Sequence, residues 1–293
     1  MTAEPNASPG LSISDIAAGL HQLGLGLGAG VMVHSSLRSL GRVDGGALAV
    51  IRALQEVLTP TGTLLMPSFN HGAPFEPGGP GYYDPLTTPT TNGIIPDTFW
   101  RQPCVRRSLD PTHAVAAWGA QAERYTRLHH RTLTMGPASP LGLLCADGGY
   151  ALLLGVGYGS NTFHHVVEMS TCAPCLGQRS EAYPVHLPGG RHVLGRTWGW
   201  RAESCPFNDS ALYQQEMAAL NLQRVLLIGP CRATLYRLQD GYRVIACTLA
   251  SGMGPYPPCR ACPVRPRVVE QTVTSDWDAE KKVLLPDSVA WSY

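Results

Sequence analysis

Apolar residues near the start of the chain recur at two different spacings, which predict alternating helices and strands. Ser12 and Ser14 are both suited to cap a helix with an apolar stripe formed by Ile16, Leu20 and Leu23. Residues 31–33 form a short apolar run typical of a buried strand. A second striped segment at 48–58 ends at a Pro/Gly turn, and another apolar run follows at 63–66. This order of strand, helix and strand indicates an α/β unit with a buried parallel pair.

The alternation continues almost to residue 250. Further strands are expected at 113–118, 150–156 and 223–228, and helices at 120–128, from about 162, and at 239–250. Residues 67–85 hold nine Gly or Pro in nineteen positions, which predicts a long surface loop. Residues 172–207 are irregular and contain a Gly-Gly turn, so we expect an inserted hairpin or subdomain there. The predicted organisation is a loose tail at 1–11, a domain at 12–250 with this insertion, and a segment at 251–293 that packs on the insertion.

Composition and charge exclude several classes of protein. Hydrophobic residues make up 44% of the 293 positions and charged residues 15%, which excludes a disordered chain. The formal charge of +1 leaves no broad basic surface for nucleic acid. The longest strongly apolar run, 151–156, is far shorter than the ~20 residues of a membrane helix. The first residues form neither a basic nor an apolar segment, so we expect no secretory signal and a cytoplasmic protein without nucleic-acid or membrane partners.

A hydroxyl- and glycine-rich turn follows the first predicted strand. Residues 34–46 are His-Ser-Ser-Leu-Arg-Ser-Leu-Gly-Arg-Val-Asp-Gly-Gly. Turns of this kind present backbone N–H groups and a helix N-terminus to an anion, and the serine hydroxyls with Arg38 or Arg42 would add donors and charge. The segment is not a Walker loop, because the required Gly and Lys spacing is missing. Ordinary turn chemistry is the alternative interpretation.

A second constellation leaves the strand at 150–156 through a glycine turn. Asn161 is a suitable N-cap for the helix that follows, and His165 and Glu168 lie three residues apart on one face of it. A neighbouring carboxylate holds an imidazole in one tautomer and raises its basicity, which is the arrangement of a general base. The position at the end of a strand is also where open α/β sheets bind ligands. A surface ion pair is the alternative.

A third candidate is the sequence Asp-Pro-Thr-His at 110–113, just before the predicted strand at 113–118. His113 is either a second histidine of the site or a hydrogen-bonded residue at a strand edge. Its residue type alone does not decide between the two.

The motifs occur together in a particular order. Ser-Ser-Leu-Arg-Ser-Leu-Gly is followed by Asp-Pro-Thr-His, by Gly-Pro-Ala-Ser-Pro at 136–140 before an expected short helix, and by Asn-Thr-x-x-His-x-x-Glu at 161–168. In this order the chain resembles the aminoglycoside 3-N-acetyltransferase family, whose members transfer an acetyl group from acetyl-CoA to an amine of 2-deoxystreptamine. The resemblance is close over about 12–170 and looser to about 250. It implies a three-layer α/β/α fold with a mixed central sheet, and a role in antibiotic resistance.

The resemblance also implies roles for individual residues. His165 would take a proton from the acceptor amine, Glu168 would orient it, and Thr162 would donate to the thioester oxygen. CoA would be held by the serine turn and the Asp-Pro-Thr-His segment, through Ser35, Ser36, Leu37, Arg38, Ser39, Thr112 and His113. Neither motif contains a cysteine, so direct transfer is expected rather than an acetyl-cysteine intermediate. The expected partners are an acyl-CoA and a small amine, bound by a monomer or homodimer.

Two features depart from the family. A polycationic acceptor calls for a pocket rich in carboxylates, yet the loop and insertion supply few. The candidates for acceptor contacts are Glu76, Asp84 and Glu181, each of which is also explained as a solvated loop charge. An amine on a biosynthetic intermediate is therefore an alternative acceptor.

The cysteines are the second departure. Four of the nine cysteines form two Cys-x-x-Cys pairs, Cys172 with Cys175 and Cys259 with Cys262, which are separated by 83 residues. Their four thiolates suit a closed structural zinc site, and Cys205 is a substitute ligand. Redox pairs and ordinary half-buried cysteines are the alternatives. A zinc-braced, non-catalytic binding module on the same fold is the rival function. A serine hydrolase is disfavoured because Gly-x-Ser-x-Gly is missing.

Overall fold

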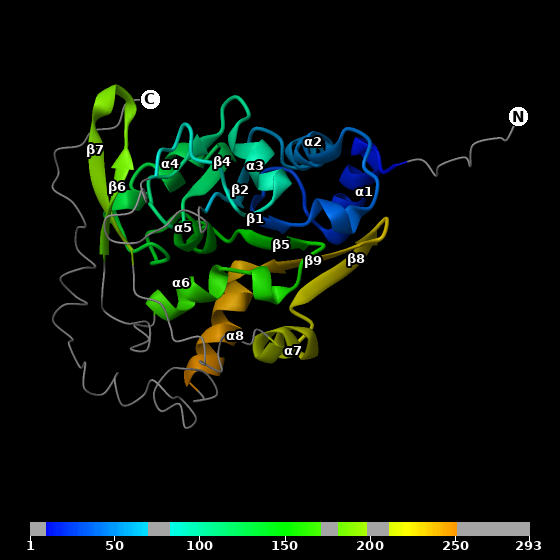
Figure 1. The fold of residues 1–293 in the computed structure, drawn as a ribbon. Helices are drawn as coiled ribbons and strands as arrows, with labels where there is room; N and C mark the ends of the chain where they lie inside the picture. Colours follow the sequence, from blue (N-terminus) through cyan, green and yellow to red (C-terminus); the bar gives the residue numbers. More distant parts are fainter. Residues whose placement is uncertain (1–9, 70–82, 171–180, 198–210, 251–293) are drawn as a thin grey trace, which may run out of the picture.

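The core of the protein is a mixed seven-stranded sheet (Figure 1). The computed structural model describes residues 10–69, 83–170, 181–197 and 211–250. The strand order is β3-β4-β2-β1-β5-β9-β8. The strands are β1 (Gly30–Ser35), β2 (Thr63–Pro67), β3 (Arg106–Arg107), β4 (Val115–Gly119), β5 (Tyr150–Leu154), β8 (Gln223–Ile228) and β9 (Cys231–Arg237). Central β1 runs parallel to β2 and β5, and the outer strands pair antiparallel, so the expected parallel pair and mixed sheet are confirmed.

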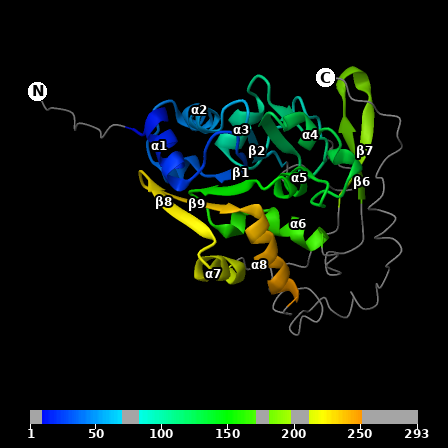
Figure 2. The same cartoon turned by 180° about the vertical axis from the view of Figure 1, so that it is seen from behind.

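Helices cover both faces of the sheet (Figures 1 and 2). One face packs against α1 (Ile13–Leu23), α2 (Gly46–Leu58) and α3 (Ile94–Trp100). The other packs against α4 (Ala122–Thr126), α5 (Pro140–Ala146), α6 (Phe163–Ser170), α7 (Ala211–Ala219) and α8 (Leu238–Ala250). Successive residues of β1 point into different cores, because side chains alternate along a strand: Val31 and Val33 face α1 and α2, and Met32 faces α5 and α6. The three-layer α/β/α architecture is confirmed.

The first helix begins at Ser12 rather than at Ser14. The Ser12 hydroxyl accepts a hydrogen bond from Asp15 N at 3.2 Å, and the Asp15 carboxylate accepts one from Ser12 N at 2.9 Å. Leu11 is already tied to the body of the protein, since its N–H donates to Arg42 O at 2.8 Å. The expected tail at 1–11 is therefore too long by that residue, and residues 1–9 lie outside the described chain.

Four elements were missed by the sequence patterns. They are α3, α7, β3 and, most consequentially, β9, which follows β8 through a tight turn at 229–230 and returns antiparallel beside β5. Four consecutive residues of β9, from Ala233 to Tyr236, are buried because helices cover both faces of the sheet there. A strand buried on both faces has no polar alternation, and Arg232 and Thr234 also interrupt the continuous apolar run that would otherwise indicate such a strand.

The insertion contains the expected hairpin. Strands β6 (Glu181–His186) and β7 (His192–Thr197) pair antiparallel across a turn at Pro188–Gly190. Both turn glycines adopt positive φ, 76° at Gly189 and 72° at Gly190, which residues with a Cβ rarely adopt. Val185 packs in a small cluster with Tyr83 and Leu109, so the hairpin is anchored beside the chain segment that precedes β4.

None of the helices within the described ranges is long and apolar enough to cross a bilayer.

Candidate active site

The sheet topology brings the predicted motifs to one edge. The serine turn follows β1, residues 68–69 follow β2, and the glycine turn follows β5. These three strands are parallel, so their carboxyl ends lie at the same edge. Strand β4 is antiparallel to β2, with Val115 opposite Pro67, so the Asp-Pro-Thr-His segment before β4 reaches that edge as well. Segments far apart in sequence therefore meet at one end of the sheet.

The serine turn is bonded directly to the glycine turn. The Ser39 hydroxyl donates to Gly155 O at 2.8 Å, and Ser36 N donates to Leu154 O at 2.9 Å. Gly155 has a φ of 73°, and a Cβ on it would lie 2.4 Å from the Ser39 Cβ. The close approach of the two turns thus depends on a glycine at this position.

The imidazole of His165 and the carboxylate of Glu168 form a hydrogen-bonded pair on α6. His165 Nδ1 donates to Glu168 Oε2 at 2.9 Å. The Glu168 side chain is 0% exposed and that of His165 is 17% exposed, so solvent can reach the imidazole but not the carboxylate. Since Nδ1 carries the proton of this bond, the neutral ring has its lone pair on Nε2. The arrangement can accept a proton at Nε2 and stabilise the resulting imidazolium.

The start of α6 is fixed by Asn161. Its side-chain oxygen accepts from Phe163 N at 3.2 Å, and its side-chain nitrogen donates to the Tyr236 hydroxyl at 2.5 Å. Tyr236 stacks on Tyr158, with ring centroids 5.6 Å apart. Burial raises the pKa of Tyr236 well above its ordinary value, so the phenol stays neutral. Strand β9 and the turn before α6 together hold the helix that carries His165.

Several buried polar atoms near the two turns make no hydrogen bond within the described chain, among them Thr162 Oγ1, Ser35 Oγ and His34 Nε2. Such atoms are costly to bury, and bound ligands commonly satisfy them. Thr162 and Ser35 were expected at the site from the sequence. His34 was not, although its place at the end of an apolar strand, directly before two serines, is a usable signal. Burial lowers the pKa of His34 to about 4, so its ring is neutral near pH 7.

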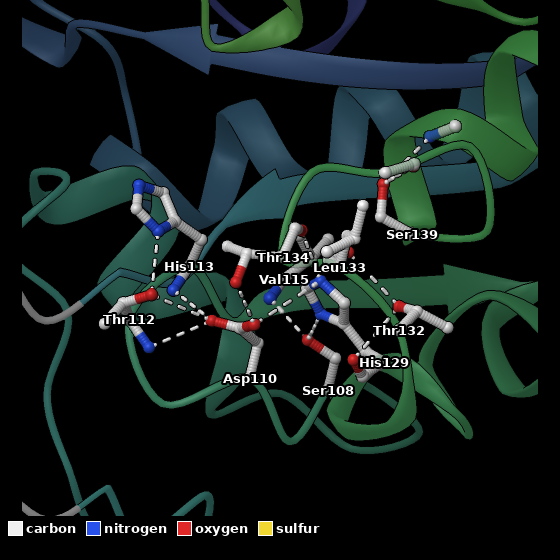
Figure 3. A network of polar contacts seen from close by, with 12 residues as sticks. Ser108, Asp110, Thr112, His113, Val115, His129, Thr132, Leu133, Thr134 and Ser139 are labelled. Carbon is white, nitrogen blue, oxygen red and sulfur yellow. Dashed lines mark hydrogen bonds and ion pairs between the residues drawn. The ribbon is translucent and has the colours of Figure 1, made fainter. Parts of the chain in front are cut away.

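The Asp-Pro-Thr-His segment is organised by the buried carboxylate of Asp110, as Figure 3 shows. Asp110 Oδ1 accepts from Thr112 N, from Thr112 Oγ1 and from His113 N, at 3.0, 3.0 and 2.7 Å. The second oxygen accepts from Thr134 Oγ1 at 2.8 Å. The loop before β4 is therefore pinned by one side chain.

His113 is a buried member of this network. The Thr112 hydroxyl donates to Asp110 and so accepts from His113 Nδ1, at 2.9 Å. This bond fixes the tautomer and the direction of the ring, whose edge packs against Phe69 with centroids 4.6 Å apart. The structure places His113 at the same sheet edge as the serine turn, in a fixed orientation.

The ends of the loop expected at 67–85 are held by a buried arginine. Arg107 donates to Ser68 O at 3.3 Å, to Pro85 O at 3.1 Å and to Thr88 O at 2.7 Å. Asp84 uses its carboxylate locally, because Oδ1 accepts from Leu86 N at 2.7 Å. This contact gives a hydrogen bond to one oxygen of the carboxylate that was expected to contact the acceptor.

The remaining predicted residues divide into two groups. Leu37 and Arg38 lie in the short 3₁₀ helix Leu37–Leu40, where Leu37 packs against the α1/α2 core and Arg38 is exposed. Glu181 begins β6, where its backbone pairs with Thr197. Five residues lie outside the described chain: Glu76, Cys172, Cys175, Cys259 and Cys262, as does the substitute ligand Cys205.

The sequence matches a known family model. Residues 32–249 match the model described as aminoglycoside 3-N-acetyltransferase. Among curated proteins, the chain is 40% identical over 163 residues to aminoglycoside N(3)-acetyltransferase IV from Salmonella sp, covering 55% of this chain and 60% of that protein. The chain thus aligns with less than two thirds of that relative's length.

Solved structures agree with this match. A mutant of aminoglycoside acetyltransferase AAC(3)-IVa in complex with apramycin is 31% identical, with a TM-score of 0.69, over 88% of this chain and 99% of that one. AAC-IIIb in a binary complex with CoASH is 25% identical, with a TM-score of 0.72, over 83% and 97%. The family match over most of the chain and the shared architecture lead to one conclusion: this chain belongs to the aminoglycoside 3-N-acetyltransferase family of acyltransferases.

Proposed function

We propose that this chain transfers an acetyl group from acetyl-CoA to an amine of an aminoglycoside, with His165 as the general base. The observation that carries the proposal is the His165–Glu168 hydrogen bond of 2.9 Å, with the carboxylate fully buried and the imidazole partly exposed. This pair lies on the helix that leaves the glycine turn, which is itself bonded to the serine turn. The relatives' names and the CoASH complex supply the donor and the acceptor class.

The proton balance follows from the tautomer of His165. The acceptor amine forms a bond to the thioester carbon while His165 Nε2 takes its proton, and the carbon–sulfur bond then breaks to release CoA. Glu168 keeps Nδ1–H bonded throughout and stabilises the imidazolium without accepting its proton. The proton on His165 leaves with the CoA thiolate, which resets the base for the next cycle.

The developing oxyanion needs a donor, and Thr162 is our candidate. Its hydroxyl is buried, makes no hydrogen bond within the described chain, and lies one turn before the proposed base. A single preorganised donor of this kind contributes roughly 3 kcal/mol to transition-state stabilisation. The serine turn, with Ser35, Ser36, Leu37, Arg38 and Ser39, and the Asp110-ordered pair Thr112 and His113 would bind CoA.

Carboxylates are the proposed contacts for a polycationic acceptor. They are Asp84, whose Oδ1 also accepts a hydrogen bond in a local turn, together with Glu76 and Glu181. A sparse set of carboxylates also favours a second candidate acceptor, a less charged amine on a biosynthetic intermediate. Acetylation of either amine removes one positive charge from the product, which in an aminoglycoside is the proposed basis of antibiotic resistance.

The acceptor class is tested by measuring CoA thiol release with a panel of aminoglycosides and simpler amines. We expect release with at least one amine of a 2-deoxystreptamine ring, and a product heavier by one acetyl group. Release of the CoA thiol with simple amines alone would favour the second candidate acceptor, a less charged amine, over an aminoglycoside. No release with any amine would support the non-catalytic binding module instead.

A further inference from the structure

A second histidine lies directly before the proposed base on α6. His164, His165 and Glu168 each offer one donor atom, and the three atoms lie within 4.8 Å of one another. The two imidazole rings are close, with centroids 3.9 Å apart and planes at 44°. His164 has no role in the proposed acetyl transfer. Its position nevertheless completes a set of two imidazoles and one buried carboxylate.

A hydrogen bond orients the His164 ring as the rings of metal ligands are oriented. His164 Nδ1 lies 2.7 Å from Asn161 O, and because a carbonyl only accepts, Nδ1 is the protonated nitrogen. The lone pair of His164 is therefore on Nε2. Metal-binding histidines typically donate their other N–H to a backbone carbonyl or a carboxylate, which is what His164 does toward Asn161 O.

We infer that a zinc ion binds His164, His165 and Glu168 and inhibits acetyl transfer. Two histidines and one glutamate are a common ligand set for Zn²⁺ with one position open to water, and the two nitrogen donors disfavour Mg²⁺ and Ca²⁺. Zinc ligands about 2.1 Å from the ion are roughly 3.4 Å apart, so side-chain rotation within one helical turn must draw the three donors closer.

Inhibition follows from competition for the same atoms. An ion bound to His165 occupies a lone pair that would otherwise take the acceptor proton, and an ion bound to Glu168 draws the carboxylate away from Nδ1–H. The inhibitory part of this inference rests on the proposed function. The binding part rests only on the three side chains, so the two parts are tested by separate measurements.

Binding is tested by titrating the full chain with Co²⁺, a spectroscopic substitute for Zn²⁺. His164→Asn is the informative variant, because the Asn amide can replace Nδ1–H toward Asn161 O but offers no Nε2. His21→Asn is the matched control, since His21 Nδ1 also lies against a backbone carbonyl, Leu25 O at 3.2 Å, on the remote helix α1. Cobalt held by cysteines adds a near-ultraviolet thiolate band, whereas a His/Glu site gives visible bands alone.

We expect wild type and His21→Asn to show the visible bands without the thiolate band, and His164→Asn to bind Co²⁺ at least about tenfold more weakly at this site. If the visible bands show that wild type, His21→Asn and His164→Asn bind Co²⁺ equally, the proposed metal site is wrong. Added Zn²⁺ should displace the bound Co²⁺ and abolish its visible bands. Bands that persist in excess Zn²⁺ would contradict the assignment to zinc.

Inhibition is tested by acetyl transfer with added Zn²⁺, divided by each protein's own rate with EDTA. Acetylated product is measured by mass spectrometry, because Zn²⁺ also binds the CoA thiol. We expect inhibition that EDTA reverses, with at least about tenfold more Zn²⁺ needed for His164→Asn. Equal sensitivity of this variant and wild type would overturn inhibition through this site. Metal binding at His164 without inhibition would leave the site in place and contradict His165 as the base.

Discussion

Two adjacent buried histidines show how much a single residue's hydrogen bonds matter in this fold. His129 Nε2 donates to Thr134 O at 2.7 Å, and its Nδ1 accepts from the Ser108 hydroxyl at 2.8 Å (Figure 3). His130, next to it, is equally buried, yet neither of its ring nitrogens has a hydrogen-bond partner in the described chain. The same residue type is therefore stabilising at one position and costly at the next.

This contrast gives a stability prediction. Replacing His130 by Leu removes two unsatisfied polar atoms and keeps most of the volume, so the free energy of unfolding should stay the same or rise by about 1 kcal/mol. Replacing His129 by Leu strands the Ser108 hydroxyl and Thr134 O, and should cost about 2–4 kcal/mol. Urea denaturation of both variants measures the difference. Equal destabilisation by the two variants would contradict it.

The same residues predict how stability depends on pH. Burial lowers the pKa of His34 and of His130 to about 4, whereas an unfolded histidine titrates near about 6.5. Between these values the unfolded chain binds protons that the native state does not, so stability falls as the pH drops through this window. Each histidine should account for roughly 2 kcal/mol between about pH 7.5 and pH 5.

The check is urea denaturation at both pH values. On acidification, the free energy of unfolding of His130→Leu should fall by roughly 2 kcal/mol less than that of wild type, which is the contribution of this one histidine. A variant with the same pH dependence as wild type would show that His130 is not buried in its neutral form.

At the scale of elements, the site depends on the contact between the serine and glycine turns. Gly155→Ala forces a φ of 73° on a residue with a Cβ and drives that atom to 2.4 Å from the Ser39 Cβ. We expect it to cost at least about 2 kcal/mol of stability and to lower kcat/KM, because the turns must separate.

Gly157→Ala is the control for this prediction. Gly157 has a φ of −93°, and a Cβ on it would meet nothing within 4 Å. Its stability should stay within about 0.5 kcal/mol of wild type. Thermal unfolding and steady-state kinetics of both variants are the measurements, and a Gly155→Ala protein as stable and active as Gly157→Ala would refute the contact.

Helices with a one-sided apolar stripe and strands with a continuous apolar run were predictable from the sequence, and β9 has neither pattern. Helix α1 shows a clear stripe of Ile16, Leu20 and Leu23, and the start of α6 follows from Asn161. Strand β9 is Cys-Arg-Ala-Thr-Leu-Tyr-Arg, so it shows neither the regular alternation of a half-buried strand nor the continuous apolar run of β1, β2 and β5. Yet β9 supplies Tyr236, which holds the start of the proposed catalytic helix.

At the scale of the whole molecule, the parallel strands β1, β2 and β5 explain why distant motifs meet at one edge. The i, i+3 spacing of His165 and Glu168 predicts their contact, because it depends on one helix alone. The unsatisfied His34 and the Asp110 network depend on contacts across the sheet or between loops. Such contacts have no local sequence signal.

The four cysteines of the two Cys-x-x-Cys pairs remain a prediction for the whole molecule. If they form a closed structural zinc site, the purified protein should contain close to one tightly held zinc per chain after EDTA dialysis. Elemental analysis of wild type and of a Cys172→Ser, Cys259→Ser double variant measures it, with His164→Asn as the control that should keep this zinc. Protein without zinc would remove the prediction.

The role of His165 as the general base is tested most directly by acetyl transfer with His165→Ala beside wild type, together with acetyl-CoA affinity measured by calorimetry. We expect kcat to fall by at least about 100-fold, because the amine keeps its proton, while the dissociation constant for acetyl-CoA changes by less than about threefold. A variant that acetylates its acceptor at a rate comparable to wild type would contradict His165 as the base.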